Sequence, residues 1–294
     1  MAKPPPIRKR FGQNFLHDSG VLARIVAAID PQPDDPVVEI GPGRGALTAV
    51  LLERLERLVA VEIDRDLAAG LRAGFPPERL DLHVGDAMDL ALADLGPVPP
   101  GGWRIVGNLP YNISTPLLFH LLGQATAIRD MHFLLQKEVV ERMVAEPGSK
   151  RYGRLTVMLG ARAQARQLFT VGPGAFRPAP KVDSAVVRIE PLAEPLVPPH
   201  LEGSFRKVVN QAFSNRRKTV RRALTGILDP AAIEAAGIDG GRRPDQLAIH
   251  DFLALADAAQ PAANPAVAKP DPSPDPLRTA GDAFGPVDTT LEQP

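Results

Sequence analysis

The feature that most constrains this chain is a regular alternation of short apolar runs with helical patterns between residues 37 and 145. Runs rich in Val, Ile and Leu predict buried strands at 37–40, 58–64, 80–87, 103–108 and 131–136. Strands that alternate with helices at this spacing form a parallel sheet with helices on both faces. We therefore expect an α/β fold with a Rossmann-like parallel sheet.

The remaining residues predict a division of the chain into four parts. Helical spacing begins near Asp18, and two further strands are expected at 167–171 and 184–192. Four prolines cluster between 190 and 199, and helical patterns follow them. These helical patterns cover 203–213, 217–228, 230–237 and 245–259. The expected parts are a basic N-terminal arm (1–17), a sheet domain (18–195), a smaller C-terminal helical domain (196–260) and a disordered acidic, Pro-rich tail (261–294).

Composition excludes several classes of protein. The 294 residues include no cysteine, which rules out a disulfide scaffold, a thiolate metal site and a cysteine nucleophile. No apolar run is long enough to cross a bilayer, and the basic N-terminus lacks the apolar core of a secretory signal. We therefore expect a cytoplasmic protein without membrane contact, and a monomer. The six histidines show no ligand spacing, so we expect no metal site.

The net charge of zero conceals an uneven distribution. Residues 204–222 contain seven bases and no acid, whereas the last 34 residues carry five acids and two bases. Local patches rather than the total charge decide electrostatic binding, so a nucleic-acid partner remains open. The candidate phosphate contacts are Arg8, Lys9, Arg10, Lys150, Arg151, Arg154, Arg216, Arg217, Lys218, Arg221 and Arg222. A solvated helix face is the alternative interpretation of the central run.

Three glycines follow the first predicted strand, in the segment E-I-G-P-G-R-G-A-L-T (39–48). Glycines here, beginning with Gly41, permit a tight turn and close approach of the backbone to a ligand. The spacing G-x-G-x-G differs from the G-x-G-x-x-G of dinucleotide sites, so we expect a ligand that does not depend on a phosphate at this turn. A turn without any ligand is the alternative.

Acids follow the next two predicted strands, and each stands where the strand ends. Glu62 is placed to accept hydrogen bonds from the hydroxyls of a ribose, and Asp86 is placed to meet an adenine amino group. Either acid alone is equally typical of a solvated surface. The carboxyl ends of parallel strands line one crevice, however, and the two acids together with the glycines therefore predict one binding site.

The fourth strand is followed by Asn108, Leu109, Pro110 and Tyr111. The lone pair of an aromatic exocyclic amine such as N6 of adenine is delocalised into the ring. A side-chain carbonyl and a backbone carbonyl that accept both amino hydrogens would orient that lone pair. Tyr111 can stack on the extracted base. An ordinary turn with a buried tyrosine is the alternative.

A second aromatic candidate opens the segment F-R-P-A-P-K-V-D-S at Phe176. Its prolines stiffen the loop, which favours presentation of an aromatic face. Taken alone, Phe176 is equally typical of a core residue.

These motifs together resemble the ribosomal RNA adenine N6,N6-dimethyltransferase family, and within it the type that acts on 16S rRNA. The resemblance covers about residues 8–256. Its other motifs are F-G-Q-N-F-L, V-E-I-D, G-D-A, N-L-P-Y-N-I-S-T-P, Q-K-E-V-V-E-R-M, Y-G-R-L and F-S-N-R-R-K-T-V-R-R-A-L.

The resemblance implies a class I methyltransferase fold and the cofactor S-adenosyl-L-methionine. It makes residues 18–195 the methyltransferase domain, 196–260 a helical RNA-binding domain and 1–17 an arm that acts as a lid. It implies cofactor contacts from Asn14, Leu16, Gly41, Glu62, Asp86 and Asn108. It also implies that Asn108 and the backbone of Leu109 and Pro110 hold the amino group, with Tyr111 and Phe176 sandwiching the base. The implied reaction is N6,N6-dimethylation of two adjacent adenines in the 3′-terminal hairpin loop of 16S rRNA, in the immature 30S subunit.

Two other functions share much of this pattern. One is the related methyltransferase type that modifies a 23S rRNA adenine and confers antibiotic resistance; the longer N-L-P-Y-N-I-S-T-P and the basic 213–222 segment favour the 16S type. The other is a non-catalytic nucleic-acid-binding factor for assembly or transcription. Catalysis is favoured over that alternative because the residues of the binding site are intact: Gly41, Glu62, Asp86, Asn108 and Tyr111.

Overall fold

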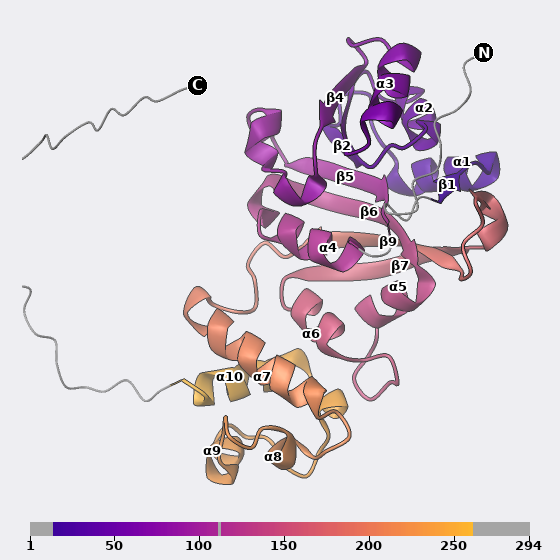
Figure 1. Ribbon diagram of the computed structural model, residues 1–294. Helices are drawn as coiled ribbons and strands as arrows, with labels where there is room; N and C mark the ends of the chain where they lie inside the picture. The colour runs from indigo at the N-terminus through magenta and orange to yellow at the C-terminus, as the bar shows by residue number, and fades with distance from the viewer. Residues whose placement is uncertain (1–13, 111–112, 261–294) are drawn as a thin grey trace, which may run out of the picture. The chain divides into compact units, whose positions relative to one another are not determined.

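The predicted strands lie side by side in a seven-stranded sheet of order β4-β3-β2-β5-β6-β9-β7, seen in the computed structural model of Figure 1. The structure describes residues 14–110 and 113–260. The predictions for Arg8, Lys9, Arg10, Tyr111 and the 261–294 tail lie outside these residues. The strands are β1 (Phe15–Leu16), β2 (Val37–Ile40), β3 (Leu58–Glu62), β4 (Leu80–Val84), β5 (Trp103–Asn108), β6 (Ile128–Gln136), β7 (Ala163–Val171), β8 (Phe176–Arg177) and β9 (Ser184–Pro191).

The helices connect these strands in the alternation that the sequence predicts. They are α1 (Ser19–Ile29), α2 (Ala46–Leu52), α3 (Arg65–Gly74), α4 (Ser114–Leu122), α5 (Lys137–Met143), α6 (Arg154–Gly160), α7 (Glu202–Ser214), α8 (Val220–Ala223), α9 (Pro230–Ala235) and α10 (Ile249–Ala258). Short 3-10 turns are η2 (Ala87–Asp89), η3 (Leu92–Leu95), η4 (Ala125–Ala127), η5 (Pro173–Ala175), η6 (Pro199–Leu201) and η7 (Pro244–Gln246). Within the described residues, none of these helices is long and apolar enough to span a membrane.

The sheet is mostly parallel, and the α/β prediction is confirmed. Strands β4, β3, β2, β5 and β6 run parallel, whereas β9 is antiparallel to both β6 and β7. From β2 the chain proceeds outward to β3 and β4, and from β5 it proceeds outward in the opposite direction to β6. The topological switch therefore lies between β2 and β5, where an open α/β sheet leaves a crevice at the carboxyl ends of its strands.

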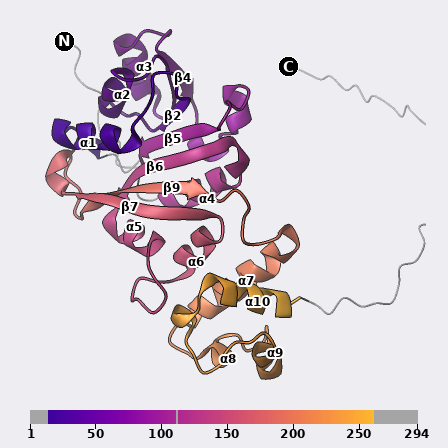
Figure 2. The ribbon, with the colours of Figure 1, turned by 180° about the vertical axis from the view of Figure 1, so that it is seen from behind.

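Helices cover both faces of the sheet because the strands are apolar on both sides. Alternate strand residues such as Val38 and Ile105 pack against α4, α5 and α6, which lie in front of the sheet in Figure 1. Their neighbours Val37 and Val106 pack against α1, α2 and α3. Helix α1 contacts α2 on that second face, which Figure 2 shows from behind.

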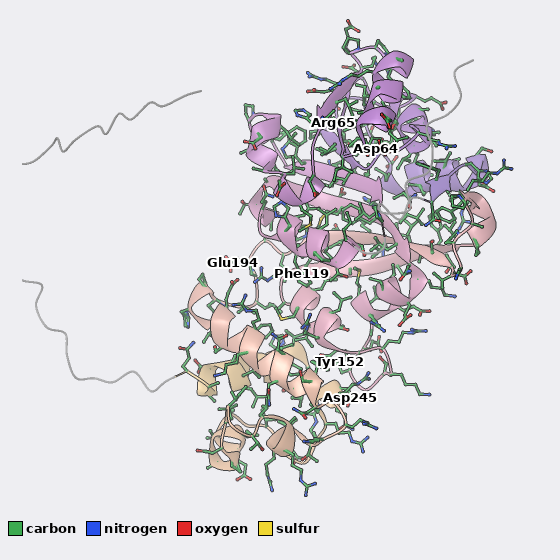
Figure 3. The ribbon with its side chains drawn as sticks, in the orientation of Figure 1. Asp64, Arg65, Phe119, Tyr152, Glu194 and Asp245 are labelled. Carbon is green, nitrogen blue, oxygen red and sulfur yellow. The ribbon has the colours of Figure 1, made fainter. Side chains whose placement is uncertain are left out.

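The chain leaves the sheet at the end of β9 and enters the C-terminal helices at η6, whose core is built around Phe205 and Phe252. This core also includes Tyr152, Val157 and Ala161, which lie in and next to α6. The Tyr152 hydroxyl donates a hydrogen bond to the Leu247 carbonyl at 2.7 Å, at the junction that Figure 3 marks with Tyr152 and Asp245. The described residues up to Gln260 thus form one compact unit, and the division into separate domains stays a prediction.

One predicted helix is wrong. The 217–228 pattern predicts a continuous helix, but α8 covers only Val220–Ala223. Thr219 before it has extended backbone angles, and Gly226 after it has a φ of 86°, which is left-handed. The apolar residues of this segment are spaced as in a helix, but a short helix followed by a turn buries them.

A buried ion network fixes the amino end of β5. The Arg104 guanidinium donates to Asp130 at 3.1 and 3.0 Å and to Asp35 at 2.7 Å, and its side chain is 5% exposed. Burial alone would raise the pKa of Asp130, but the neighbouring His132 and Arg104 outweigh it and hold that pKa well below its usual range. The network therefore stabilises the fold only while both carboxylates are charged.

We predict that Arg104→Met lowers the free energy of unfolding by about 3–5 kcal/mol at pH 7, because it removes the buried cation from between two carboxylates. Asp35 then keeps only the exposed Arg129 at 3.1 Å, and Asp130 keeps Arg188 at 3.7 Å. Urea denaturation measures this loss. Because the pKa of Asp130 is depressed in the folded state, the charged carboxylate contributes to stability above its unfolded pKa, and this contribution is lost as the pH falls. The difference in the free energy of unfolding between the wild type and Arg104→Met should therefore become smaller below about pH 4.

The matched control is Arg57→Met, which removes an arginine that pairs with Asp81 at 2.8 Å but is 63% exposed. It should cost less than about 1 kcal/mol. Equal losses for the two variants would contradict a special role for the buried network.

Candidate functional site

A cavity of about 290 Å³ opens at the carboxyl ends of β2, β3, β4 and β5, at the topological switch. Its lining includes eight residues that the sequence analysis singled out: Asn14, Leu16, Gly41, Glu62, Asp86, Asn108, Leu109 and Pro110. The strands deliver these residues to one edge from positions up to 96 residues apart in the chain. Ile40, Val61 and Ile63 add apolar surface to the same cavity.

The glycine loop between β2 and α2 forms one wall of this cavity. Gly41 has a φ of 68°, and a Cβ placed on it would meet no atom within 4 Å, so the space in front of it is open. Gly45 has a φ of 79°, and a Cβ there would lie 2.8 Å from the Phe75 ring. The loop therefore needs glycine at one position for its backbone conformation and at the other also for packing.

Glu62 at the end of β3 is held between two loops. Its Oε2 accepts a hydrogen bond from the Gly43 amide at 3.0 Å, and its Oε1 accepts one from the Asp64 amide at 2.9 Å. Burial of this 4%-exposed residue raises the pKa of its carboxyl group, and the charge of Asp64 adds to that rise. Each carboxyl oxygen keeps a second lone pair with which it can accept a hydrogen bond from a bound ligand.

Glu39 lies beneath the glycine loop and is almost fully buried. Its Oε2 accepts a hydrogen bond from the Thr48 hydroxyl at 2.6 Å. Burial, together with the nearby charge of Glu62, raises the pKa of Glu39 to about 7. The Thr48 hydroxyl lies in α2, so this hydrogen bond joins β2 to the helix that follows the glycine loop.

Asp86 follows β4 and shapes the far side of the cavity. Its Oδ1 accepts a hydrogen bond from the Met88 amide at 2.9 Å, so the carboxylate caps the turn η2. The carboxylate is exposed and lines the cavity.

The loop that follows Asp86 is held from behind by the end of α4. Gln124 accepts a hydrogen bond from the Leu92 amide at 2.7 Å and donates one to the Leu90 carbonyl at 2.9 Å. The Nε2 atom of His120 also lies 2.8 Å from the Leu90 carbonyl oxygen. Because a carbonyl oxygen only accepts, that nitrogen carries the proton. Residues 90–92 are thus held by the end of α4 and by the residue two positions after it.

The side chain of Asn108 is oriented by the N-terminal segment. Its Nδ2 donates to the Asn14 carbonyl at 2.9 Å, so its Oδ1 faces the other way. Next to it, the Leu109 side chain is buried in the core, and the Pro110 carbonyl accepts a hydrogen bond from the Ile113 amide at 3.2 Å. The amide of Asn108 therefore presents an acceptor from a fixed position.

The segment that carries Asn14 is placed by pairing between β1 and β8. Leu16 is opposite Phe176 in this two-stranded sheet, and Arg44 of the glycine loop stacks on the Phe15 ring at 4.5 Å. Phe176 itself is 2% exposed and packs in the core with Leu16. Its ring lies among these core side chains, and its role in stacking on a base stays a prediction.

The candidate phosphate contacts differ in their surroundings. Arg216 donates to the Ser149 carbonyl at 3.1 Å and lies 3.4 Å from Asp245. Arg151 pairs with Glu141 at 2.7 Å, and Arg221 pairs with Glu234 at 3.5 Å. The remaining candidates Lys150, Arg154, Arg217, Lys218 and Arg222 are exposed. The described residues include no cluster of three or more His, Asp or Glu that is arranged to hold a metal ion.

Sequence reasoning missed the residues that act through long-range contacts. Four such residues make contacts that the sequence alone does not predict: Thr48, Gln124, His120 and Phe15. Two of them lie within quoted motifs, Phe15 in F-G-Q-N-F-L and Thr48 at the end of E-I-G-P-G-R-G-A-L-T, but neither motif indicates the contact that the residue makes. The strand-end residues were found because topology alone places them.

Comparison with known proteins gives consistent matches over nearly all of the described chain. The family model described as ribosomal RNA adenine dimethylase matches residues 6–260. The protein "Ribosomal RNA small subunit methyltransferase A" of Chromobacterium violaceum is 54% identical over 87% of this chain and 96% of its own length. The protein of the same name from Thiobacillus denitrificans is 56% identical over 84% of this chain and 96% of its own.

Solved structures give the same picture. The structure of a dimethyladenosine transferase from Plasmodium falciparum matches with a TM-score of 0.68 at 25% identity, over 82% of this chain and 95% of that one. The structure of the 23S rRNA methyltransferase ErmE matches with a TM-score of 0.65 at 29% identity, over 84% of this chain and 99% of that one.

We predict that Glu39→Gln stabilises the protein at pH 8 by up to about 3 kcal/mol. The folded pKa of Glu39 is raised, so the folded state loses stability as the pH rises from the unfolded pKa to about 7, and the neutral amide removes that cost. Urea denaturation at pH 8 and pH 5 should give a clearly smaller difference at pH 5. Glu53→Gln on the exposed end of α2 is the control and should change little at either pH; a gain that does not depend on pH would contradict the assignment.

We predict that Gln124→Ala loosens the 87–95 loop, because it removes two hydrogen bonds and leaves the Leu92 amide without its side-chain acceptor, while the Leu90 carbonyl keeps only His120. Amide hydrogen exchange in that loop should speed up roughly tenfold or more, which corresponds to about 1.4 kcal/mol or more of local stability. The control Gln167→Ala removes a glutamine whose bond to Thr170 is 3.4 Å long, and it should leave the loop unchanged. Unchanged exchange in both variants would show that Gln124 does not hold the loop.

Proposed function

Because the chain belongs to the ribosomal RNA adenine dimethylase family, we propose that it catalyses S-adenosyl-L-methionine-dependent N6,N6-dimethylation of two adjacent adenines. The substrate is the 3′-terminal hairpin loop of 16S rRNA in the immature 30S subunit, and the reaction belongs to small-subunit biogenesis. The observation that carries the proposal is the Asn108 amide, held by the Asn14 carbonyl at the rim of a cavity that also contains Glu62.

The cavity fits the cofactor by the chemistry of its donors and acceptors. The open space before Gly41 accepts close approach of a ligand, and Glu62 keeps acceptor lone pairs for ribose hydroxyls. Asp86, at the far side of the cavity, would accept a hydrogen bond from the adenine amino group of the cofactor. The remaining proposed contacts come from Asn14, Leu16 and Asn108. When bound, the sulfonium of S-adenosyl-L-methionine supplies an electrophilic methyl group, so the protein needs no covalent nucleophile.

The protein's task is then to orient the target amine. The Oδ1 of Asn108 accepts one amino hydrogen, and a backbone carbonyl of Leu109 or Pro110 accepts the other. Two acceptors in fixed positions favour a more pyramidal nitrogen whose lone pair points at the methyl group. The Pro110 carbonyl already accepts one bond from Ile113, and it retains a second lone pair for this purpose.

The base itself would be held by Tyr111 and Phe176. Tyr111 lies close to Asn108 in the chain and outside the described residues. Phe176 is buried against Leu16. Stacking on a base therefore requires the β1–β8 segment to move so that the Phe176 ring becomes exposed. Extracting the adenine costs least from an unpaired loop, which fits a hairpin-loop substrate.

The 16S substrate is favoured over the 23S alternative by the sizes of the similarities. Relatives named for the small subunit are 54% and 56% identical to the chain, whereas the 23S enzyme ErmE is 29% identical. The non-catalytic alternative is disfavoured because Gly41, Glu62, Asp86 and Asn108 are all present and meet in one cavity.

The test is incubation of the purified protein and radiolabelled methyl donor with 30S subunits that lack adenine dimethylation, and with 50S subunits. We expect label as N6,N6-dimethyladenosine in 16S RNA. Label in 23S RNA would select the resistance type, and RNA binding without label would select the non-catalytic class.

We predict that Asn108→Ala lowers the rate constant of methyl transfer by about 100- to 1000-fold, because it removes an acceptor aimed at the reacting nitrogen. Binding to the subunit should persist, since no phosphate contact is lost. The control Gln164→Ala removes an amide from an exposed position of β7 and should leave the rate unchanged. A rate within tenfold of the wild type for Asn108→Ala would contradict the proposed role.

A further inference from the structure

A groove runs along α7, away from the cavity already described. One wall is formed by α7 and the other by the turn that follows α8. The groove is lined by Gly203, Arg206, Lys207, Asn210, Gln211, Ser214, Thr225, Gly226 and Ile227. No acidic side chain is among these residues.

The groove lies along the polar face of α7. Phe205, Val208, Val209 and Ala212 are the buried residues of this helix and form its apolar face. The groove residues recur along the opposite face at spacings of three and four, from Gly203 to Ser214. This face therefore presents guanidinium, ammonium, amide and hydroxyl groups in one row.

The two bases of the groove are available for a ligand. Neither Arg206 nor Lys207 forms an ion pair with any acid in the part of the chain that the structure describes, and both are exposed. Glu202, the one acid of α7, pairs instead with Arg162 at 2.9 Å. By contrast, Arg216 and Arg221 of the basic run are partnered by Asp245 and Glu234.

The groove is continuous with bases of the sheet domain. Arg154 at the start of α6 donates to Oδ1 of Asn210, a groove residue, at 3.2 Å. An extended anionic ligand in the groove would therefore meet Arg206, Lys207 and Arg154 along its length.

We propose that this groove binds the sugar–phosphate backbone of the ribosomal RNA substrate, an inference that rests on the proposed function. Arg206 and Lys207 would neutralise phosphates, while the amides of Asn210 and Gln211 and the hydroxyls of Ser214 and Thr225 pair with phosphate oxygens and 2′-hydroxyls. Such contacts hold the RNA without reading its sequence. The groove thus positions a part of the substrate other than the target adenine.

The test is the double variant Arg206→Gln/Lys207→Gln, with affinity for undermethylated 30S subunits measured over a series of salt concentrations. Each phosphate contact contributes about 0.7–0.9 to the slope of log K against log salt, so the slope should shrink by about 1.4–1.8. The same relation gives a loss of affinity of up to about 60-fold at 0.1 M salt. Cofactor binding and the thermal transition should not change, because the buried face of α7 is untouched.

Two control variants distinguish the loss of these phosphate contacts from a general loss of positive charge. Arg54→Gln/Arg72→Gln removes two exposed arginines from the α2 and α3 region and should change the slope far less. Arg206→Lys/Lys207→Arg keeps both charges and should restore most of the affinity.

The proposal that the groove binds RNA would be overturned if the glutamine variant kept the wild-type slope and an affinity within twofold. It would also be overturned if Arg54→Gln/Arg72→Gln lost as much affinity as the glutamine variant. Loss of binding to 30S subunits with full binding to protein-free 16S RNA would show that the groove binds a ribosomal protein instead, which also overturns the inference. A wild-type protein that methylates no ribosomal RNA would instead refute the proposed function on which the inference rests.

Discussion

The site depends on one buried carboxylate, that of Glu62. It ends β3 and binds the amides of Gly43 and Asp64, so the loop after β2 and the loop after β3 are fixed to the same group. Without it, two backbone amides that are buried or partly buried would lose their acceptor, which is costly. Burial raises the pKa of this carboxyl group, and those two hydrogen bonds oppose the rise. The same group can therefore act both as the support of the loops and as a ligand acceptor.

A second constraint comes from the N-terminal segment. The pairing of β1 with β8 joins residues 15–16 to residues 176–177, and it places Asn14 against Asn108. Asn108, the proposed ligand of the target amine, is thus oriented by a segment that also lines the cavity proposed for the cofactor. A substitution in β1 or β8 would therefore alter both the proposed cofactor site and the orientation of the Asn108 amide. The fold couples the two halves of the proposed reaction through the backbone of one short strand.

The sequence predicted those features that depend on local pattern and topology. Strands β2 and β5 occur at the predicted residues because each is a short run buried on both faces. Glu62, Asp86 and Asn108 were found because parallel strands bring their carboxyl ends to one edge. Strands β1 and β8 were missed because each has two residues and exists only through the other. The bonds of Thr48 to Glu39 and of Gln124 to Leu90 and Leu92 were missed for the same reason, since no periodicity reports a contact between distant side chains.

The basic run shows why charge in a sequence is a poor measure of charge on a surface. Residues 204–222 form one block of bases in the sequence, but these bases have different surroundings in the folded protein. Arg216 bonds to Ser149 and Asp245 and so joins the 149–152 region to η7. Arg206 and Lys207, which precede the dense R-R-K cluster in the sequence, line the groove on α7, which has no acidic side chain in its lining. Electrostatic affinity depends on cations that a polyanion can reach, and a cation already neutralised by an acid contributes less to counterion release. The proposed RNA groove is therefore set by the amphipathic pattern of α7, whose apolar face packs in the core and whose polar face remains exposed to solvent.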